Sequence, residues 1–171
     1  YTVSHENLMS LCRVQKDMNQ LSCGMRIISC PLPHFGLPFV YCCLMGLYLG
    51  SETFILPYNE FLRTPLLFLE AVGNLGLTHA LTTHFIMDYS LRHMNVDYRS
   101  AQLGHIQNLQ ILIRERPSTD FHRQLASTLL CNNLREQSIN YSLFSHNVPL
   151  ISSRGWFQRK PNIVHLELES L

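Results

Sequence analysis

The chain has 171 residues, of which 46% are hydrophobic and 15% are charged, and its formal net charge is +1. Typical soluble domains carry about 25% charged residues, so this composition favours a membrane protein. Because the charge is nearly neutral and no run of Lys or Arg could follow a phosphate backbone, nucleic acid is excluded as an expected partner. The six cysteines show no CxxC spacing, which predicts buried free thiols instead of a zinc site.

The first long apolar segment covers residues 36–57. Its only charged side chain is Glu52, and Pro31 and Pro33 end any helix before it. A helix of roughly 20 apolar residues crosses the roughly 30 Å hydrocarbon core of a bilayer. We therefore predict a first transmembrane helix from about Gly36 to Leu56.

The second long apolar segment covers residues 64–91 and contains Glu70 and Asp88. Thr64 and Pro65 form a good helix start, with Thr as the N-cap and Pro at the first helical position. The two segments together predict an antiparallel hairpin across a membrane. Because apolar runs are ambiguous by pattern alone, a pair of helices buried in a large soluble core is the alternative.

The polar remainder of the chain is predicted to be helical and irregular. Residues 101–116 have the pattern of an amphipathic helix, and residues 119–140 predict another helix capped by Ser118 or Thr119. The fold class is therefore all-α: residues 1–35 form an N-terminal segment, residues 36–98 form the two-span transmembrane hairpin, and residues 99–171 form a C-terminal extension. Basic residues flank the hairpin on its outer ends, which places both termini on the matrix or cytoplasmic side.

The second predicted helix carries ionisable and polar side chains at a helical spacing. At 100° per residue these side chains form one stripe along the helix, and His79 and His93 lie near one line on the opposite side. Such a stripe cannot face lipid, so it is either a packing seam or a proton or quinone path. The stripe contains Glu70, Asn74, His84, Asp88, Arg92 and Asn95.

One motif resembles a known family. The run Ser90-Leu91-Arg92-His93-Met94-x-x-Asp97-Tyr98 resembles the end of the second helix in the large, cytochrome b-type anchor subunit of succinate dehydrogenase, respiratory complex II. The resemblance covers roughly residues 25–98, with Ser29 and His34 before the first helix and Leu56-Pro57 at its end. It implies a location in the mitochondrial inner membrane or a bacterial-type plasma membrane.

The resemblance also implies cofactors, partners and site residues. Arg92 and His93 would hold haem propionates or the polar atoms of ubiquinone, and Ser29 would donate to a quinone carbonyl. The haem-ligating position of the family is Ile86 here, so a haem b iron would be ligated by His84 or His79. The partners implied are a flavoprotein subunit, an iron–sulfur subunit, a second membrane anchor subunit and membrane lipid, with the flavin chemistry on a partner chain.

Other interpretations stay open. The small anchor subunit of the same complex resembles the stretch from Thr78-His79 to Asp88-Tyr89, although Leu77 replaces one histidine of its pair. A cofactor-free accessory subunit of another mitochondrial respiratory membrane complex, or a soluble helical interaction protein, would also fit. No phosphate-binding loop, zinc spacing or nucleophile motif predicts a stand-alone enzyme.

Overall fold

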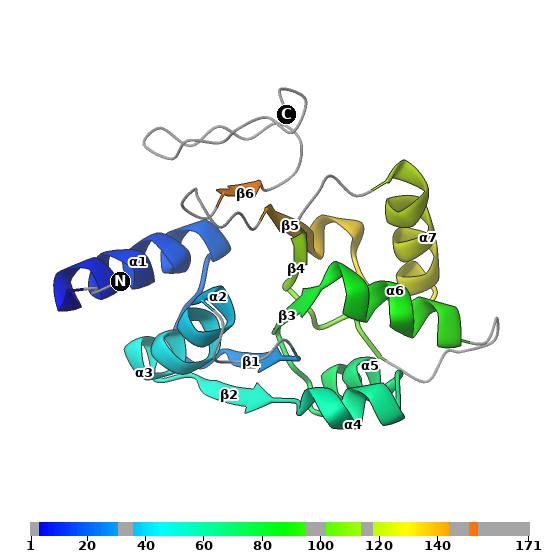
Figure 1. Ribbon diagram of the computed structural model, residues 1–171, viewed down its shortest axis with the longest axis horizontal. Coiled ribbons are helices and arrows are strands. Elements are labelled where there is room, and N and C mark those ends of the chain that lie inside the picture. The colour runs from blue at the N-terminus through cyan, green and yellow to red at the C-terminus, as the bar shows by residue number, and fades with distance from the viewer. Residues whose placement is uncertain (1–3, 31–35, 95–101, 114–117, 144–150, 154–171) are drawn as a thin grey trace.

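The computed structural model describes residues 4–30, 36–94, 102–113, 118–143 and 151–153. Its centre is a six-stranded sheet in the order β2-β1-β3-β4-β5-β6, in which the first five strands are parallel and β6 is antiparallel to β5. Helices surround the sheet (Figure 1). In chain order the elements are α1 (His5–Asn19), β1 (Arg26–Ser29), α2 (Gly36–Phe39), the π-helix η1 (Val40–Leu44), α3 (Met45–Leu49), β2 (Glu52–Ile55), α4 (Tyr58–Arg63), α5 (Leu67–Asn74), β3 (His79–Thr83), α6 (His84–His93), β4 (Asn108–Ile113), α7 (Thr119–Leu130), the 3-10 helix η2 (Glu136–Ser138), β5 (Ile139–Leu143) and β6 (Ile151–Ser153).

The predicted all-α transmembrane hairpin is wrong. Residues 36–57 divide into α2, η1, α3 and β2, and residues 64–91 divide into α5, β3 and most of α6. Within the described ranges, no helix combines the length and the apolar character that a bilayer span requires. The predicted inner-membrane location and the placement of both termini on its matrix side rested on those spans, and they are wrong for the same reason.

Glycines and buried strands explain this error. Gly50 ends α3 with a φ of +64°, and Gly76 follows α5 with a φ of +60°, a conformation that favours glycine. Thr64, the expected N-cap, instead ends α4, and α5 begins at Leu67. Strands of a parallel sheet are covered on both faces, so they appear in the sequence as continuous apolar runs. A helix, a turn and a buried strand together therefore match the length of a span.

Two helices are predicted after residue 100, over residues 101–116 and 119–140. The predicted helix over residues 101–116 is wrong, because residues 108–113 form β4 at the centre of the sheet. The predicted helix start at Ser118 is confirmed: the hydroxyl oxygen of Ser118 accepts a hydrogen bond of 3.1 Å from the Phe121 N–H. The predicted continuation of this helix to residue 140 is wrong, because α7 ends at Leu130 and β5 begins at Ile139. The last part of the predicted C-terminal extension, residues 144–171, lies outside the described residues, apart from β6.

The two faces of the sheet carry separate hydrophobic clusters. Helices α4, α5, α6 and α7 pack on one face, here called the α7 face, against strand residues such as Ile28, Ala80 and Ile111. Helix α1 with η1 and α3 packs on the other, here called the α1 face, against Ile27 and Leu81. The chain is therefore an α/β unit of three layers, with the sheet between two layers of helices.

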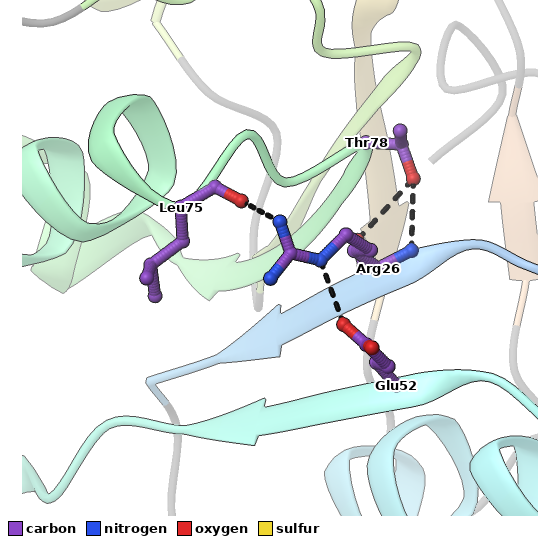
Figure 2. Close-up of polar contacts among 4 residues, drawn as sticks. All are labelled: Arg26, Glu52, Leu75 and Thr78. Atoms are coloured by element: carbon purple, nitrogen blue, oxygen red, sulfur yellow. Dashed lines mark hydrogen bonds and ion pairs between the residues drawn. The ribbon is translucent and has the colours of Figure 1, made fainter.

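Arg26 joins the strands at the amino end of the sheet, as Figure 2 shows. Its guanidinium forms an ion pair of 2.8 Å with Glu52 of β2 and donates to the carbonyl oxygen of Leu75, the C-cap of α5. Its backbone N–H donates to the Thr78 hydroxyl oxygen at 3.2 Å, and that hydroxyl donates back to the Arg26 carbonyl at 3.3 Å. One side chain therefore fixes β1, β2 and the turn before β3.

Candidate functional site

The order of the strands places a candidate site at the carboxyl ends of β1 and β3. After β1 the chain adds β2 on one side and then β3 on the other, so the winding direction changes between β1 and β3. In open α/β sheets, ligands bind outside the carboxyl ends of the strands at such a switch point. We therefore take the carboxyl ends of β1, β3, β4 and β5 as the candidate site.

Small hydroxyl side chains gather at these ends. Ser29 closes β1 and is fully buried, and Thr82 and Thr83 close β3. The Thr83 hydroxyl oxygen caps α6 by accepting from the Ile86 N–H at 3.2 Å. The Thr82 hydroxyl is buried without a hydrogen-bond partner among the described residues. These groups are polar but uncharged.

A carboxamide and a hydroxyl extend this set on the α1 face. Ser29, Leu81 and Gln110 share one row of the sheet, on β1, β3 and β4. The Gln110 Nε2 donates a short hydrogen bond to the Ser142 hydroxyl oxygen on β5, and both residues are fully buried. Within the described part of the chain, Gln110 Oε1 has no partner. A buried acceptor left unsatisfied costs about 1–3 kcal/mol.

The thiols of Cys30 and Cys42, near the switch point, stay protonated at neutral pH. Burial raises the pKa of Cys30 to about 12 and that of Cys42 to about 12. The hydroxyl of Ser29 lowers the Cys42 pKa and Cys43 raises it, both less strongly than burial. Since the thiolate is the nucleophilic form of cysteine, these raised pKa values exclude Cys30 and Cys42 as nucleophiles near neutral pH. The predicted buried thiols are confirmed for Cys12, Cys30 and Cys42, whereas Cys23 and Cys131 are exposed.

A Tyr–His–Glu chain lies on the α7 face. The Tyr141 hydroxyl of β5 lies 2.6 Å from His122 Nδ1 of α7, and His122 Nε2 lies 3.6 Å from a Glu136 carboxylate oxygen. Burial raises the pKa of Tyr141, so the phenol stays protonated and can donate to His122. The arrangement ties α7 to β5, and we assign it to structure.

The five residues predicted to bind haem or quinone do not share one helix. Ser29 lies in β1, and the buried His79 lies in β3 with its Nδ1 3.0 Å from the Thr78 hydroxyl. His84 opens α6, and its ring centroid lies 4.1 Å from that of Phe121. Arg92 is an exposed ion-pair partner of Asp88 at 2.8 Å, and His93 Nδ1 lies 2.8 Å from the Tyr89 carbonyl oxygen.

The structure brings Ser29 and His79 onto neighbouring strands, whereas Arg92 and His93 lie at the far end of α6. Ile86, the family's ligand position, is buried in the α7-face core. No cluster of three or more His, Cys, Asp or Glu able to hold a metal ion occurs in the part of the chain that the structure describes. Haem b and ubiquinone binding stay untested predictions, and His34, Asp97 and Tyr98 lie outside the described residues.

Sequence reasoning missed Gln110, Ser142 and Thr82. Gln110 stands in the sequence Asn-Leu-Gln-Ile-Leu-Ile, whose alternation of polar and apolar residues was a strand signal. Its partner Ser142 lies 32 positions further along the chain. Only the pairing of β4 with β5 shows that these two polar side chains meet.

Comparison with curated proteins finds distant relatives, and no protein-family model matches the chain. The chain is 22% identical over 174 residues to Disco-interacting protein 2 homolog B of Mus musculus, covering 99% of the chain and 11% of that protein. It is 22% identical over 191 residues to the Homeostatic regulator of DAG of Saccharomyces cerevisiae, covering 99% of the chain and 12% of that protein. The chain spans about a tenth of the length of the curated relatives it matches.

Solved structures share the fold. The fatty acyl-adenylate ligase of L. pneumophila, in complex with acyl adenylate and pyrophosphate, matches with a TM-score of 0.74 and 19% identity, over 83% of this chain and 25% of the ligase. The adenylation domain of a keto acid-selecting NRPS module, bound to keto acyl adenylate, matches with a TM-score of 0.76 and 14% identity, over 88% of this chain and 28% of that domain. The chain therefore has the α/β fold of one part of such domains.

These findings correct the functional prediction. The resemblance to either anchor subunit of succinate dehydrogenase is wrong, because the chain has an α/β fold that it shares with parts of solved ligase and adenylation-domain structures. The predicted flavoprotein, iron–sulfur and anchor partners are therefore wrong as well. The alternative of a cofactor-free respiratory accessory subunit is wrong for the same reason. The predicted motif at Arg92 and His93 is an exposed helix end with local contacts.

Proposed function

We propose that this chain is part of an adenylation-type domain that binds an acyl adenylate, and that the carboxyl ends of β1, β3, β4 and β5 form one wall of the binding site. The observation that carries the proposal is the shared sheet: over 83% and 88% of its length the chain matches two proteins that hold acyl adenylates. The switch point between β1 and β3 is where a sheet of this kind binds its ligands.

The chemistry of the proposed wall suits such a ligand. The polar groups of Ser29 and Gln110 share a row of the sheet with the apolar Leu81, and Thr82 shares a row with the apolar Ile111 on the other face. Hydroxyls and amides can orient the polar atoms of a ligand, while apolar neighbours accommodate its hydrocarbon parts. The match covers only 25% and 28% of these two structural neighbours, so the proposed wall corresponds to one part of a complete site.

The test is calorimetric titration of the full-length protein with a stable acyl-adenylate analogue, palmitoyl-sulfamoyl adenosine. We expect saturable binding that is much tighter than binding of palmitate or AMP alone. We expect Ser29→Ala, at the carboxyl end of β1, to weaken binding about three- to tenfold. Glu52→Gln, at the amino end of β2, should leave binding unchanged. Absence of binding would refute the proposal.

Synthesis of the adenylate is a separate question with its own readout. In that reaction a carboxylate oxygen bonds to the α-phosphorus of ATP while the bond to the leaving pyrophosphate breaks. Acid-dependent exchange of labelled pyrophosphate into ATP measures this step directly. Exchange would assign ligase chemistry to the full-length protein, whereas analogue binding without exchange would assign a binding role without synthesis.

A further inference from the structure

The α1 face of the sheet carries two rows of buried polar side chains that run in the same direction across β4 and β5. The first row, here called the closed row, begins on α1, where Asn19 Nδ2 donates to Gln15 Oε1 at 2.9 Å. Asn108 Nδ2 donates to Asn19 Oδ1 at 3.3 Å, and Asn140 Nδ2 donates to Asn108 Oδ1 at 2.9 Å. None of the buried oxygens and nitrogens of these side chains lacks a partner.

The second row, here called the open row, lies two residues closer to the carboxyl ends of both strands. It consists of Gln110 on β4 and Ser142 on β5, joined by the hydrogen bond from Gln110 Nε2 to the Ser142 oxygen. Both side chains are fully buried, yet Gln110 Oε1 has no partner among the described residues. Helix α1 closes the first row through Asn19, the last residue of the helix. The open row has no such closing group in the described part of the chain.

The open row offers one hydrogen-bond acceptor beside one donor. The Ser142 oxygen accepts from Gln110, which leaves its O–H free to donate, and Gln110 Oε1 is free to accept. Turning the Gln110 carboxamide by 180° exchanges the two roles but keeps one acceptor beside one donor. Neither side chain carries a charge, so the pair would not offset the charge of a phosphate.

We infer that Gln110 and Ser142 form a subsite for an uncharged ligand edge in which a hydrogen-bond donor stands beside an acceptor, as in a carboxamide or an aminopurine. The inference rests on the proposed function, because the open row lies on the strands whose carboxyl ends form the proposed wall. Glutamine and asparagine pair with such edges through two hydrogen bonds, as they do with adenine. In an acyl adenylate this edge is supplied by the base or by an amide on the acyl group.

The experiment separates these two sources. The full-length protein is titrated with palmitoyl-sulfamoyl adenosine, with the same compound lacking the 6-amino group of the purine, and with a compound whose acyl chain ends in a carboxamide. Gln110→Met removes the polar group at constant length, and Gln15→Met makes the same change in the closed row. Backbone hydrogen exchange confirms that each variant is folded, and Ser142→Ala serves as the second variant if Gln110→Met does not fold.

The expected result is a difference of about tenfold in Kd between ligands with and without the matching edge, which equals about 1.4 kcal/mol. Gln110→Met should abolish this difference, and Gln15→Met should preserve it. A penalty for the missing 6-amino group assigns the subsite to the base, and a gain from the carboxamide assigns it to the acyl group.

Two outcomes would overturn the inference. If the wild-type protein shows no such difference, or if the difference persists in Gln110→Met, the open row is closed by water or by another part of the protein, and the subsite is refuted while the proposed function stands. If the wild-type protein binds none of the three compounds, the proposed function fails and the subsite fails with it.

Discussion

The two ends of the parallel sheet use polar side chains in different ways. At the amino end, Arg26 contacts Glu52, Leu75 and Thr78, and the closed row joins α1 to β4 and β5 through satisfied amides. Further along the strands, Gln110 in the middle of β4 and Thr82 at the carboxyl end of β3 are buried with polar atoms that no described residue satisfies. Satisfied networks stabilise and specify a fold, whereas unsatisfied buried groups are costly unless a ligand or solvent meets them. The difference separates an end that holds the fold from an end that is available for binding.

The largest expected effect is a loss of stability at alkaline pH. It arises from buried thiols, one of which, Cys30, directly follows the carboxyl end of β1. Burial raises the pKa of Cys30 and Cys42 to about 12, above the ordinary value of 9.0. Because these folded-state pKa values are raised, their contribution is complete below pH 9 and falls as the pH rises from about 9 to about 12, by a few kcal/mol per thiol. Thermal unfolding against pH measures the loss. Cys42→Ala should reduce it, and the exposed Cys23→Ala should not.

The second effect is the cost of breaking the closed row. Asn108→Leu leaves the buried Asn19 Oδ1 without its donor and leaves Asn140 Nδ2 with only the Ser138 carbonyl as acceptor, so we expect a loss of about 1–3 kcal/mol. Gln110→Met removes the hydrogen bond to the Ser142 oxygen, but it also removes an acceptor that is already unsatisfied, so its net loss should be smaller, about 1 kcal/mol. Hydrogen exchange of the β4 amides in the full-length protein measures both. Equal losses in the two variants would contradict the distinction between the rows.

The third effect concerns the packing of α3 on β2. A Cβ at Gly46 would lie 2.5 Å from the Thr53 hydroxyl oxygen, closer than any real contact. Gly46→Ala should therefore cost about 1–3 kcal/mol through overpacking. The double variant Gly46→Ala with Thr53→Ala should recover most of that loss in thermal unfolding. Failure of the second substitution to recover stability would show that the cost arises elsewhere.

The smallest loss of stability is expected from removing the contacts of the Arg26 side chain with Glu52 and Leu75. Arg26→Met loses the ion pair with Glu52, but the two side chains are 38% and 67% exposed, so solvent and salt screen the pair. Together with the lost bond to the Leu75 carbonyl, the expected cost is about 1 kcal/mol. Glu52→Gln should cost less and should lose its effect in high salt. A salt-independent loss in Glu52→Gln would contradict the assignment to an exposed ion pair.

Some of the fold could be read from the sequence. The start of α7 and its Ser118 cap follow from a local pattern, and the structure confirms them, although the helix ends at Leu130 and not at residue 140. The sheet could not be read in the same way, because β3 and β4 are covered on both faces and resemble pieces of apolar helices. Gly50 and Gly76 were the local signals that divide the apparent spans into helix, turn and strand. The turn signals of these two glycines outweigh the apolar length of each segment.

The candidate site was less predictable than the fold. Ser29 and His79 were singled out by a resemblance to a membrane protein, and the structure places them on neighbouring parallel strands. The alternation around Gln110 signals a strand but not a site, because Gln110 meets Ser142 only when β4 pairs with β5. The same holds for Arg26, whose partners Glu52 and Thr78 lie 26 and 52 positions away.

Hydrogen exchange of the full-length protein, with and without palmitoyl-sulfamoyl adenosine, directly tests whether the carboxyl end of the sheet binds an acyl adenylate. We expect slower exchange in peptides that contain the carboxyl ends of β1, β3, β4 and β5, including Ser29, Thr83 and Ser142. Peptides at the amino end, around Arg26 and Glu52, should exchange at an unchanged rate. Protection confined to the amino end, or no protection at a saturating concentration of the analogue, would contradict this expectation.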